Sequence, residues 1–354
     1  MKKTFLATTA LLAAGNSFAA DVTAYGQVNK LIMGVDNGTE TNTAIVDNDA
    51  SSTRFGFKFQ QQLENNLVVS ALLELQTESN SSSGVDMEDE DTNEESDASG
   101  ISERHSRIGI GSKYGTFFIG KTSEATDGIA EIDLGGVSDV MYSDASIVGA
   151  AVKFVQKDGS ALSASKKIGD LYSNFDGGRE NLVRYDSPIF NGVSSSASIT
   201  SGGDVALAAK YSGKIAGHLN VKAGLGYEKV ATSSTIDDQI TGSISAKCDN
   251  TGLAATVAMG QRTFETAGRD DAEFMYTKLS YMPNGSNFEY AVDYANSEAV
   301  SGNNEELDAY GVGAQYNIAK GVSTSVMYRM LEADNLSEEA DEIQVMTAGL
   351  KVKF

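Results

Sequence analysis

The sequence predicts an all-β fold, a sixteen-stranded antiparallel transmembrane β-barrel formed by residues 20–354. Three observations predict it. Apolar and polar residues alternate in segments of roughly ten residues, short turns alternate with longer polar loops, and the chain begins with an export signal. A soluble β-sandwich would also alternate, but its strands usually have about five or six residues. The long strands and the many small polar residues therefore favour a barrel around a water-filled lumen.

The first 19 residues have the features of a signal peptide. Lys2 and Lys3 precede an apolar stretch at 4–14, and Ser17 and Ala19 are the small residues that a signal peptidase reads. The stretch is shorter than the roughly 20 residues that a membrane-spanning helix needs. We expect cleavage after Ala19 and export of the remaining chain.

The last strand shows the alternation most clearly. One face carries Met346, Ala348, Leu350, Val352 and Phe354; the other carries Thr347, Gly349, Lys351 and Lys353. An apolar outer face that ends on a terminal aromatic is typical of the closing strand of a membrane barrel. Because the chain has no Trp, we expect Tyr and Phe to form the aromatic belts at the membrane interfaces.

The connections between strands fall into two classes. Seven short turns contain Gly or Asn, which tolerate the positive φ of tight turns; they lie at 64–66, 113–115, 188–192, 214–217, 250–252, 283–285 and 319–321. Eight longer loops alternate with them, at 37–51, 79–103, 123–180, 201–204, 232–239, 264–270, 298–305 and 333–341. Fifteen connections join sixteen strands.

Composition excludes several classes of function. The formal net charge of −22 argues against binding nucleic acid. One cysteine, Cys248, allows no internal disulfide, and two histidines leave too few ligands for a zinc site of the usual type, so we expect no cofactor. His105 and His218 have no recognisable nucleophile and orienting carboxylate beside them, which argues against an enzyme.

The loop 79–103 contains a dense acidic run at 86–97. We interpret the run as a solvated external loop. One functional alternative is diffuse binding of Ca²⁺ or Mg²⁺. The other, a contact with another subunit, is implied by the family resemblance described below. The spacing lacks the mid-loop Gly of a full calcium-binding loop.

Charged residues in the predicted lumen are the candidate functional residues. Strand parity points four cations inward: Arg54, Lys58, Arg107 and Arg184. The loop 123–180 is far longer than its neighbours, and its first half is acidic, with no Lys or Arg before Lys153. Loops of this length are usually functional. The simpler alternatives are a solvated external loop and inward arginines that only pair with neighbouring carboxylates.

Several motifs follow one another along the chain: VTAYGQV at 22–28, SSTRFGF at 51–57, RIGIGSKYGTF at 107–117, VRYDSP at 183–188 and Phe354 at the end. Their order resembles that of the general porins of Gram-negative bacteria, with a softer similarity to marine gammaproteobacterial members. The resemblance covers the whole mature chain. It implies a homotrimeric outer-membrane channel in contact with lipid and lipopolysaccharide. It also implies that the barrel insertion machinery reads Phe354 as an assembly signal.

The resemblance further implies a pore constricted by the loop after strand five, 123–180. Family members set an arginine ladder opposite acidic loop residues. Here Arg54, Lys58, Arg107 and Arg184 match the ladder and Asp127, Glu131 and Asp133 the acidic side, while Gln27 stands where the family has a lysine. Such a transverse field favours small polar solutes.

We therefore expect a water-filled diffusion channel for ions and small hydrophilic solutes, with a weak preference for cations. The alternatives are a substrate-selective channel and a surface receptor or adhesin. A sugar channel would need lumen aromatics, for which Phe274 and Tyr276 are the inward candidates.

Overall fold

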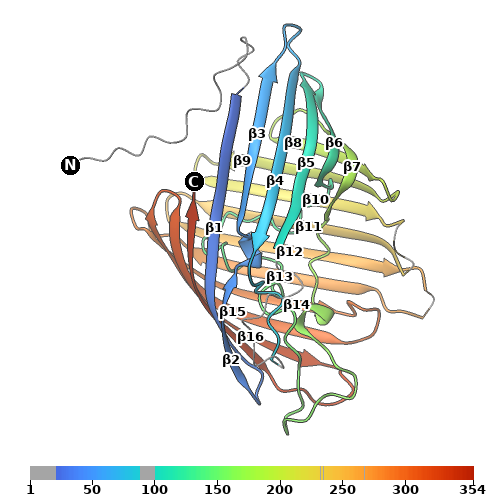
Figure 1. Cartoon of the computed structure of the whole chain (residues 1–354), viewed down its shortest axis with the longest axis vertical. Coiled ribbons are helices and arrows are strands. Elements are labelled where there is room, and N and C mark those ends of the chain that lie inside the picture. Colours follow the sequence, from blue (N-terminus) through green and yellow to red (C-terminus); the bar gives the residue numbers. More distant parts are fainter. Residues whose placement is uncertain (1–20, 88–99, 232, 234, 267) are drawn as a thin grey trace.

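The computed structural model describes residues 21–87, 100–231, 233, 235–266 and 268–354, so the predicted signal peptide and most of the acidic run lie outside the described residues. The described chain forms one closed antiparallel sheet, in which the first strand pairs with the last (Figure 1). The seventeen strands fill sixteen positions around the barrel, and we call each position a stave. Two successive strands share the second stave, because they lie end to end and pair with different parts of the first strand. The predicted sixteen-stranded barrel is confirmed.

The strands are β1 (Asp21–Asp36), β2 (Thr41–Asp47), β3 (Arg54–Gln62), β4 (Val68–Glu78), β5 (Gly100–Ser112), β6 (Gly115–Ser123), β7 (Arg179–Asp186), β8 (Val193–Thr200), β9 (Val205–Ile215), β10 (Leu219–Lys229), β11 (Ile236–Cys248), β12 (Leu253–Phe264), β13 (Ala272–Tyr281), β14 (Phe288–Glu298), β15 (Glu306–Ala319), β16 (Val322–Asp334) and β17 (Ile343–Lys353). The helical elements are a 3₁₀ turn, η1 (Asp49–Ser51), and α1 (Ile168–Leu171). No helix in the described part of the chain is long and apolar enough to cross a bilayer.

Short turns gather at one end of the barrel and long loops at the other. We call these the turn end and the loop end. The start of β1 and the end of β17 both lie at the turn end, since Gln27 pairs with Lys353. Several connections differ from the expected bounds. The first loop, expected at 37–51, is only 37–40, because residues 41–47 form β2. The second long loop is shortened to 79–99, because β5 begins at Gly100, and the long segment that follows β6 is 124–178.

The outer surface is apolar along most strands, as the alternation predicts. Phe288 lies with its ring centroid 4.6 Å from Tyr316 and 6.2 Å from Tyr290, on the part of the surface nearest the turn end. Tyr294 and Tyr310 form a second pair, 5.3 Å apart, nearer the loop end. These outward clusters have the amphipathic character that suits two membrane interfaces.

The interior holds an apolar core, which the alternation rule does not predict. Segment 124–178 runs inside the barrel (Figure 1) and packs its apolar residues against the inner faces of β1 and of β13 to β17. Leu31 and Met33 of β1 contribute to this core, although both point inward. Gly313 permits the close approach, because a Cβ there would lie 2.6 Å from the sulfur of Met141. One side of the lumen is therefore filled by protein.

The second stave is interrupted between β2 and β3. Residues 48–53 leave the sheet and make η1, which Asn48 caps by accepting from the amide of Ala50. Gln27 of β1 fastens this break, because its side-chain amide donates to the carbonyls of Ser51 and Ser52 at 2.9 and 2.8 Å. The break carries Asp49 toward the interior.

Candidate functional site: the barrel lumen

Three inward cations of the barrel wall hold segment 124–178 in place. Lys278 donates to Asp133 at 2.6 Å and to the carbonyl of Met141 at 2.8 Å. Arg329 donates to Asp293 at 2.6 Å and to the carbonyl of Ala145 at 2.9 Å. A third anchor joins Lys351 to Asp139. In the sequence, Lys278 and Arg329 resemble ordinary lumen lining.

The structure does not bring Asp133 to the basic wall. Its carboxylate also accepts from the Thr256 hydroxyl at 2.6 Å and from the Gly135 amide at 2.7 Å, so its two partners on the barrel wall come from strands β12 and β13. The side chain of Lys278 is 1% exposed and that of Asp133 is 7% exposed. Counting charges along the loop could not reveal this, because the partner lies 145 positions away. Asp133 is placed to anchor the segment rather than to face a passing ion.

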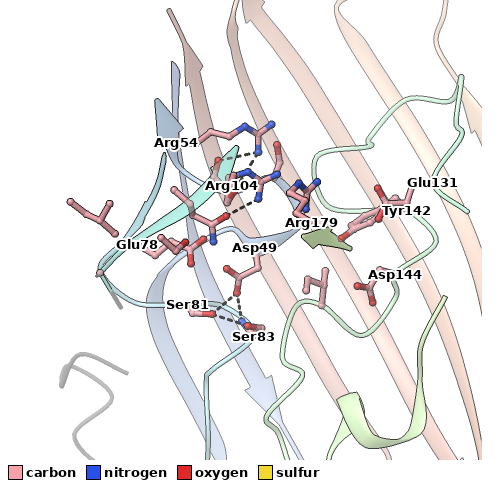
Figure 2. A pocket seen from close by; sticks show the side chains of 18 residues that line it. Asp49, Arg54, Glu78, Ser81, Ser83, Arg104, Glu131, Tyr142, Asp144 and Arg179 are labelled. Atoms are coloured by element: carbon pink, nitrogen blue, oxygen red, sulfur yellow. Dashed lines mark hydrogen bonds between the residues drawn. The ribbon is translucent and has the colours of Figure 1, made fainter. Parts of the chain in front are cut away.

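A water-accessible cavity of about 800 Å³ lies on the other side of the segment (Figure 2). Acidic and basic side chains line it together: Asp49, Arg54, Glu78, Arg104, Glu131, Asp144 and Arg179. They come from β3, β4, β5, β7, the break in stave two and segment 124–178. The cavity combines expected residues (Arg54 and Glu131) with others that the sequence did not single out.

Arg104 enters the cavity because of an irregularity in β5. Glu74 of β4 pairs with His105 and Leu75 pairs with Glu103, so Arg104 is an extra residue that opposes no partner. This bulge turns its guanidinium inward, where Nε donates to Glu74 at 2.8 Å and Nη1 donates to Gln76 at 2.7 Å. Strand parity alone finds Arg107 but misses Arg104, because a bulge shifts the parity.

Arg54, by contrast, follows the expected parity. Its Nε lies 3.8 Å from Glu74, and Glu74 also accepts from the hydroxyl of Tyr25 at 2.7 Å. One carboxylate is therefore shared by two arginines and a tyrosine. Of the three predicted inward arginines, Arg54 and Arg184 lie beside neighbouring acids, as the simpler alternative expects, and Arg104 does the same.

The acidic side of the cavity is formed by segment 124–178. Asp127 lies 3.3 Å from Arg179, the first residue of β7. Glu131 makes no ion pair with another described residue and stands near Asp127, Asp144 and Asp176. Its side chain is exposed to the lumen, but enclosure by the surrounding protein, then repulsion from Asp176, raises the pKa of Glu131 to about 8. Burial likewise raises the pKa of Asp176 to about 7. At neutral pH this side therefore carries less negative charge than its composition implies.

A second cavity, of about 680 Å³, follows toward the turn end along the same wall. Lys58 and Arg107 line it with Asp21. Lys58 lies 4.4 Å from the ring centroid of Tyr25, and the Arg107 guanidinium lies 4.0 Å from that of Phe118. Since Lys58 is four residues beyond Arg54 on one strand, the two cavities are offset by roughly 13 Å. The expected basic wall is thus spread along the lumen axis.

Arg184 has a different set of partners from the other three cations. Its Nε donates to Asp186 at 2.7 Å, and Nη1 donates to the carbonyls of Ser123 and Glu124 at 3.1 and 2.8 Å. These contacts fix the point at which segment 124–178 leaves β6.

The two inward aromatics are covered. Phe274 is 3% exposed and Tyr276 1% exposed. Phe175 of the segment packs edge-on against Phe274 at 5.3 Å, and the Tyr276 hydroxyl donates to Asp293. Neither ring is placed to stack against a solute in the lumen.

A closed antiparallel barrel with an apolar outer surface and charged cavities in its interior defines a membrane channel of the porin type. The family model described as Gram-negative porin matches residues 7–336, and the chain belongs to this family of the bacterial outer membrane. No curated protein sequence matches the chain significantly.

Solved structures share the fold at low identity. An anion-selective porin from Comamonas acidovorans is 16% identical, with a TM-score of 0.67 over 95% of this chain and 100% of that one. The trimer form of OmpT, an outer membrane protein of Vibrio cholerae, is 13% identical, with a TM-score of 0.61 over the same shares. Salmonella typhi OmpF in complex with daunomycin is 14% identical, with a TM-score of 0.58 over 94% and 97%.

Proposed function

We propose that ions and small hydrophilic solutes cross this outer-membrane channel through the two cavities beside segment 124–178, which acts as the constriction. The observation that carries the proposal is the division of the lumen. One side is closed by an apolar core and three anchoring cations. The other side holds charged side chains around about 800 and 680 Å³ of space. The buried Phe274 and Tyr276 remove the main support for a sugar-selective channel.

We also infer a weak cation preference, which is set near the loop end. Each arginine of the first cavity lies beside an acid: Arg54 and Arg104 share Glu74, and Arg179 has Asp127. Asp49, Glu78, Glu131 and Asp144 line the cavity in addition. Acidic groups therefore outnumber the three arginines, although the raised pKa of Glu131 reduces this excess at neutral pH. Lys58 and Arg107 act in the opposite sense further in. The anion-selective relative does not decide the sign here, because 16% identity establishes the fold alone.

A homotrimer is the assembly that we propose, by analogy with the trimer form of Vibrio cholerae OmpT. A planar bilayer recording in a KCl gradient tests both proposals. We expect conductance steps in threes and a reversal potential of cation sign that weakens as salt rises, since charges beyond about 8–10 Å are screened at physiological salt. A clear anion-sign potential at low salt would refute the preference.

A further inference from the structure

Glu78 is a buried acid in the wall of the first cavity. It is the last residue of β4 and points inward with Glu74 and Gln76 of the same strand. The residue is 8% exposed, and its Oε1 has no hydrogen-bond partner among the described residues. A buried carboxylate oxygen without a partner is costly unless a cation, a donor or a proton satisfies it.

The nearby cations are engaged elsewhere. Arg104 donates to Glu74 and Gln76, and Arg54 lies nearest to Glu74. The guanidinium of Arg179 pairs with Asp127. In Figure 2 Glu78 and Asp49 both lie below the three arginines, with Asp49 to the right of Glu78. The wall thus presents an acid that its own arginines do not neutralise.

Asp49 adds a second carboxylate to this wall. Its Oδ2 accepts from the Ser81 hydroxyl at 2.5 Å and from the Ser83 amide at 2.6 Å, which fixes the side chain against the base of loop 79–99. Asp49 is the acid that repels Glu78 most strongly. Two carboxylates that line one cavity and repel each other favour a bound cation or a shared proton between them.

We propose that Glu78 and Asp49 form a binding site for a divalent cation, for which Ca²⁺ is the natural probe. Two carboxylates match a charge of +2, and the hydroxyls of Ser81 and Ser83 border the same cavity. Carboxylate, hydroxyl and water oxygens are the ligands that hard cations take. The site is distinct from the acidic run at 86–97. Binding itself does not depend on the proposed channel function; only the effect on current rests on it.

Tyrosine-sensitised Tb³⁺ emission, with competition by Ca²⁺, tests the site on the purified full chain. Tyr142 lines the same cavity, and the chain has no Trp. We expect wild type to show one saturable, Ca²⁺-competed component that Glu78→Gln weakens at least tenfold. Glu78→Gln removes no hydrogen bond at Oε1, so folding should persist, as heat-modifiable mobility would verify. The control is Glu339→Gln, which neutralises an external-loop acid whose side chain is 85% exposed.

Bilayer recordings supply the second readout. Millimolar Ca²⁺ on the loop end should lower the K⁺ conductance of wild type and of Glu339→Gln but not that of Glu78→Gln. Asp49→Asn should behave as Glu78→Gln does. Equal Tb³⁺ binding by wild type and Glu78→Gln would overturn the site, as would a pH-dependent proton uptake at these carboxylates without Ca²⁺ competition. If Glu78→Gln loses the Tb³⁺ emission but wild type carries no channel current, the channel function is refuted and the binding site is not.

Discussion

The C-terminal residue Phe354 lies across Gly26 of the first strand. Each donates its backbone amide to the carbonyl of the other at 3.0 Å, so this pair completes the ladder that closes the barrel. The Phe354 ring covers Gly26 on the outer surface, where a Cβ on Gly26 would lie 2.6 Å from the ring. An aromatic ring over a glycine of the neighbouring strand stabilises strand pairing.

We therefore expect deletion of Phe354 and the substitution Gly26→Val to impair the same step, closure of the barrel. Deletion removes the last ladder pair, and valine displaces the ring. Both should lower the amount of heat-modifiable barrel in the outer membrane, which semi-native electrophoresis measures. Tyr114→Ala, which removes an exposed aromatic from another turn, is the control. Wild-type amounts of folded Gly26→Val would show that the ring contact has no role in closure.

The buried pair of Lys278 and Asp133 should determine how firmly the constriction is held. Asp133→Asn leaves the Lys278 ammonium buried without its counter-charge, a change that costs about 3–5 kcal/mol in buried pairs. We expect a lower unfolding temperature and larger, noisier single-channel currents. Asp133→Leu combined with Lys278→Met should recover most of the stability.

The exposed pair of Lys157 and Glu339 provides the control for this anchor. Its nitrogen–oxygen distance is 3.3 Å, but both side chains face solvent, so Glu339→Gln should change stability by less than about 1 kcal/mol. Equal unfolding temperatures and current noise for Asp133→Asn and Glu339→Gln would contradict the anchoring role.

Arg104→Ala should strengthen cation preference and enlarge conductance. The substitution removes a guanidinium from the first cavity and leaves Glu74 with one fewer cation. A unit charge at about 4 Å contributes about 1 kcal/mol in water, with opposite signs for a cation and an anion, so the cation-to-anion permeability ratio should rise by at most about thirtyfold. Reversal potentials in a KCl gradient measure the ratio. Lys157→Ala removes a solvent-exposed lysine of segment 124–178 that does not line either cavity, and it should leave the ratio unchanged. A shift toward anions in Arg104→Ala would be the contrary outcome.

Selectivity should also depend on pH through Glu131. Enclosure by the surrounding protein and the neighbouring Asp176 raise the pKa of Glu131 from 4.5 to about 8. The carboxyl ionises as pH rises through 8, so cation preference should increase between pH 6.5 and pH 9. Glu131→Gln should flatten that part of the profile, whereas Glu339→Gln should not. An unchanged profile in Glu131→Gln would assign the titration to another group.

The pH dependence of stability provides an independent check of the raised pKa of Glu131. The pKa of Glu131 is higher in the folded barrel than in the unfolded chain, so the folded state holds the proton more tightly. The stability that protonated Glu131 contributes to the folded barrel is fully present below pH 4.5 and is lost as pH rises through 8. Relative to wild type, Glu131→Gln should therefore gain heat resistance between pH 5 and pH 9. A loss of relative heat resistance over that range would contradict the raised pKa.

Local sequence rules were sufficient for the barrel wall. Period-two alternation in β17 and the glycine- and asparagine-bearing turns depend on neighbours a few positions apart, so strand number, strand order and the outward faces could be read from the chain. The inward direction of Arg54 and Arg107 follows from the same rule. These features can be derived from contacts within a single hairpin.

The lumen was decided by tertiary structure. Asp133 was expected among the acids that face the basic wall, but Lys278, far along the chain, draws it to the opposite side. Arg104 entered the cavity through a bulge, and Asp49 through a break in the second stave. Contacts over such sequence separations depend on how the closed barrel brings its walls together. The sequence by itself therefore determined the wall, and only the folded chain decided which charges face the water.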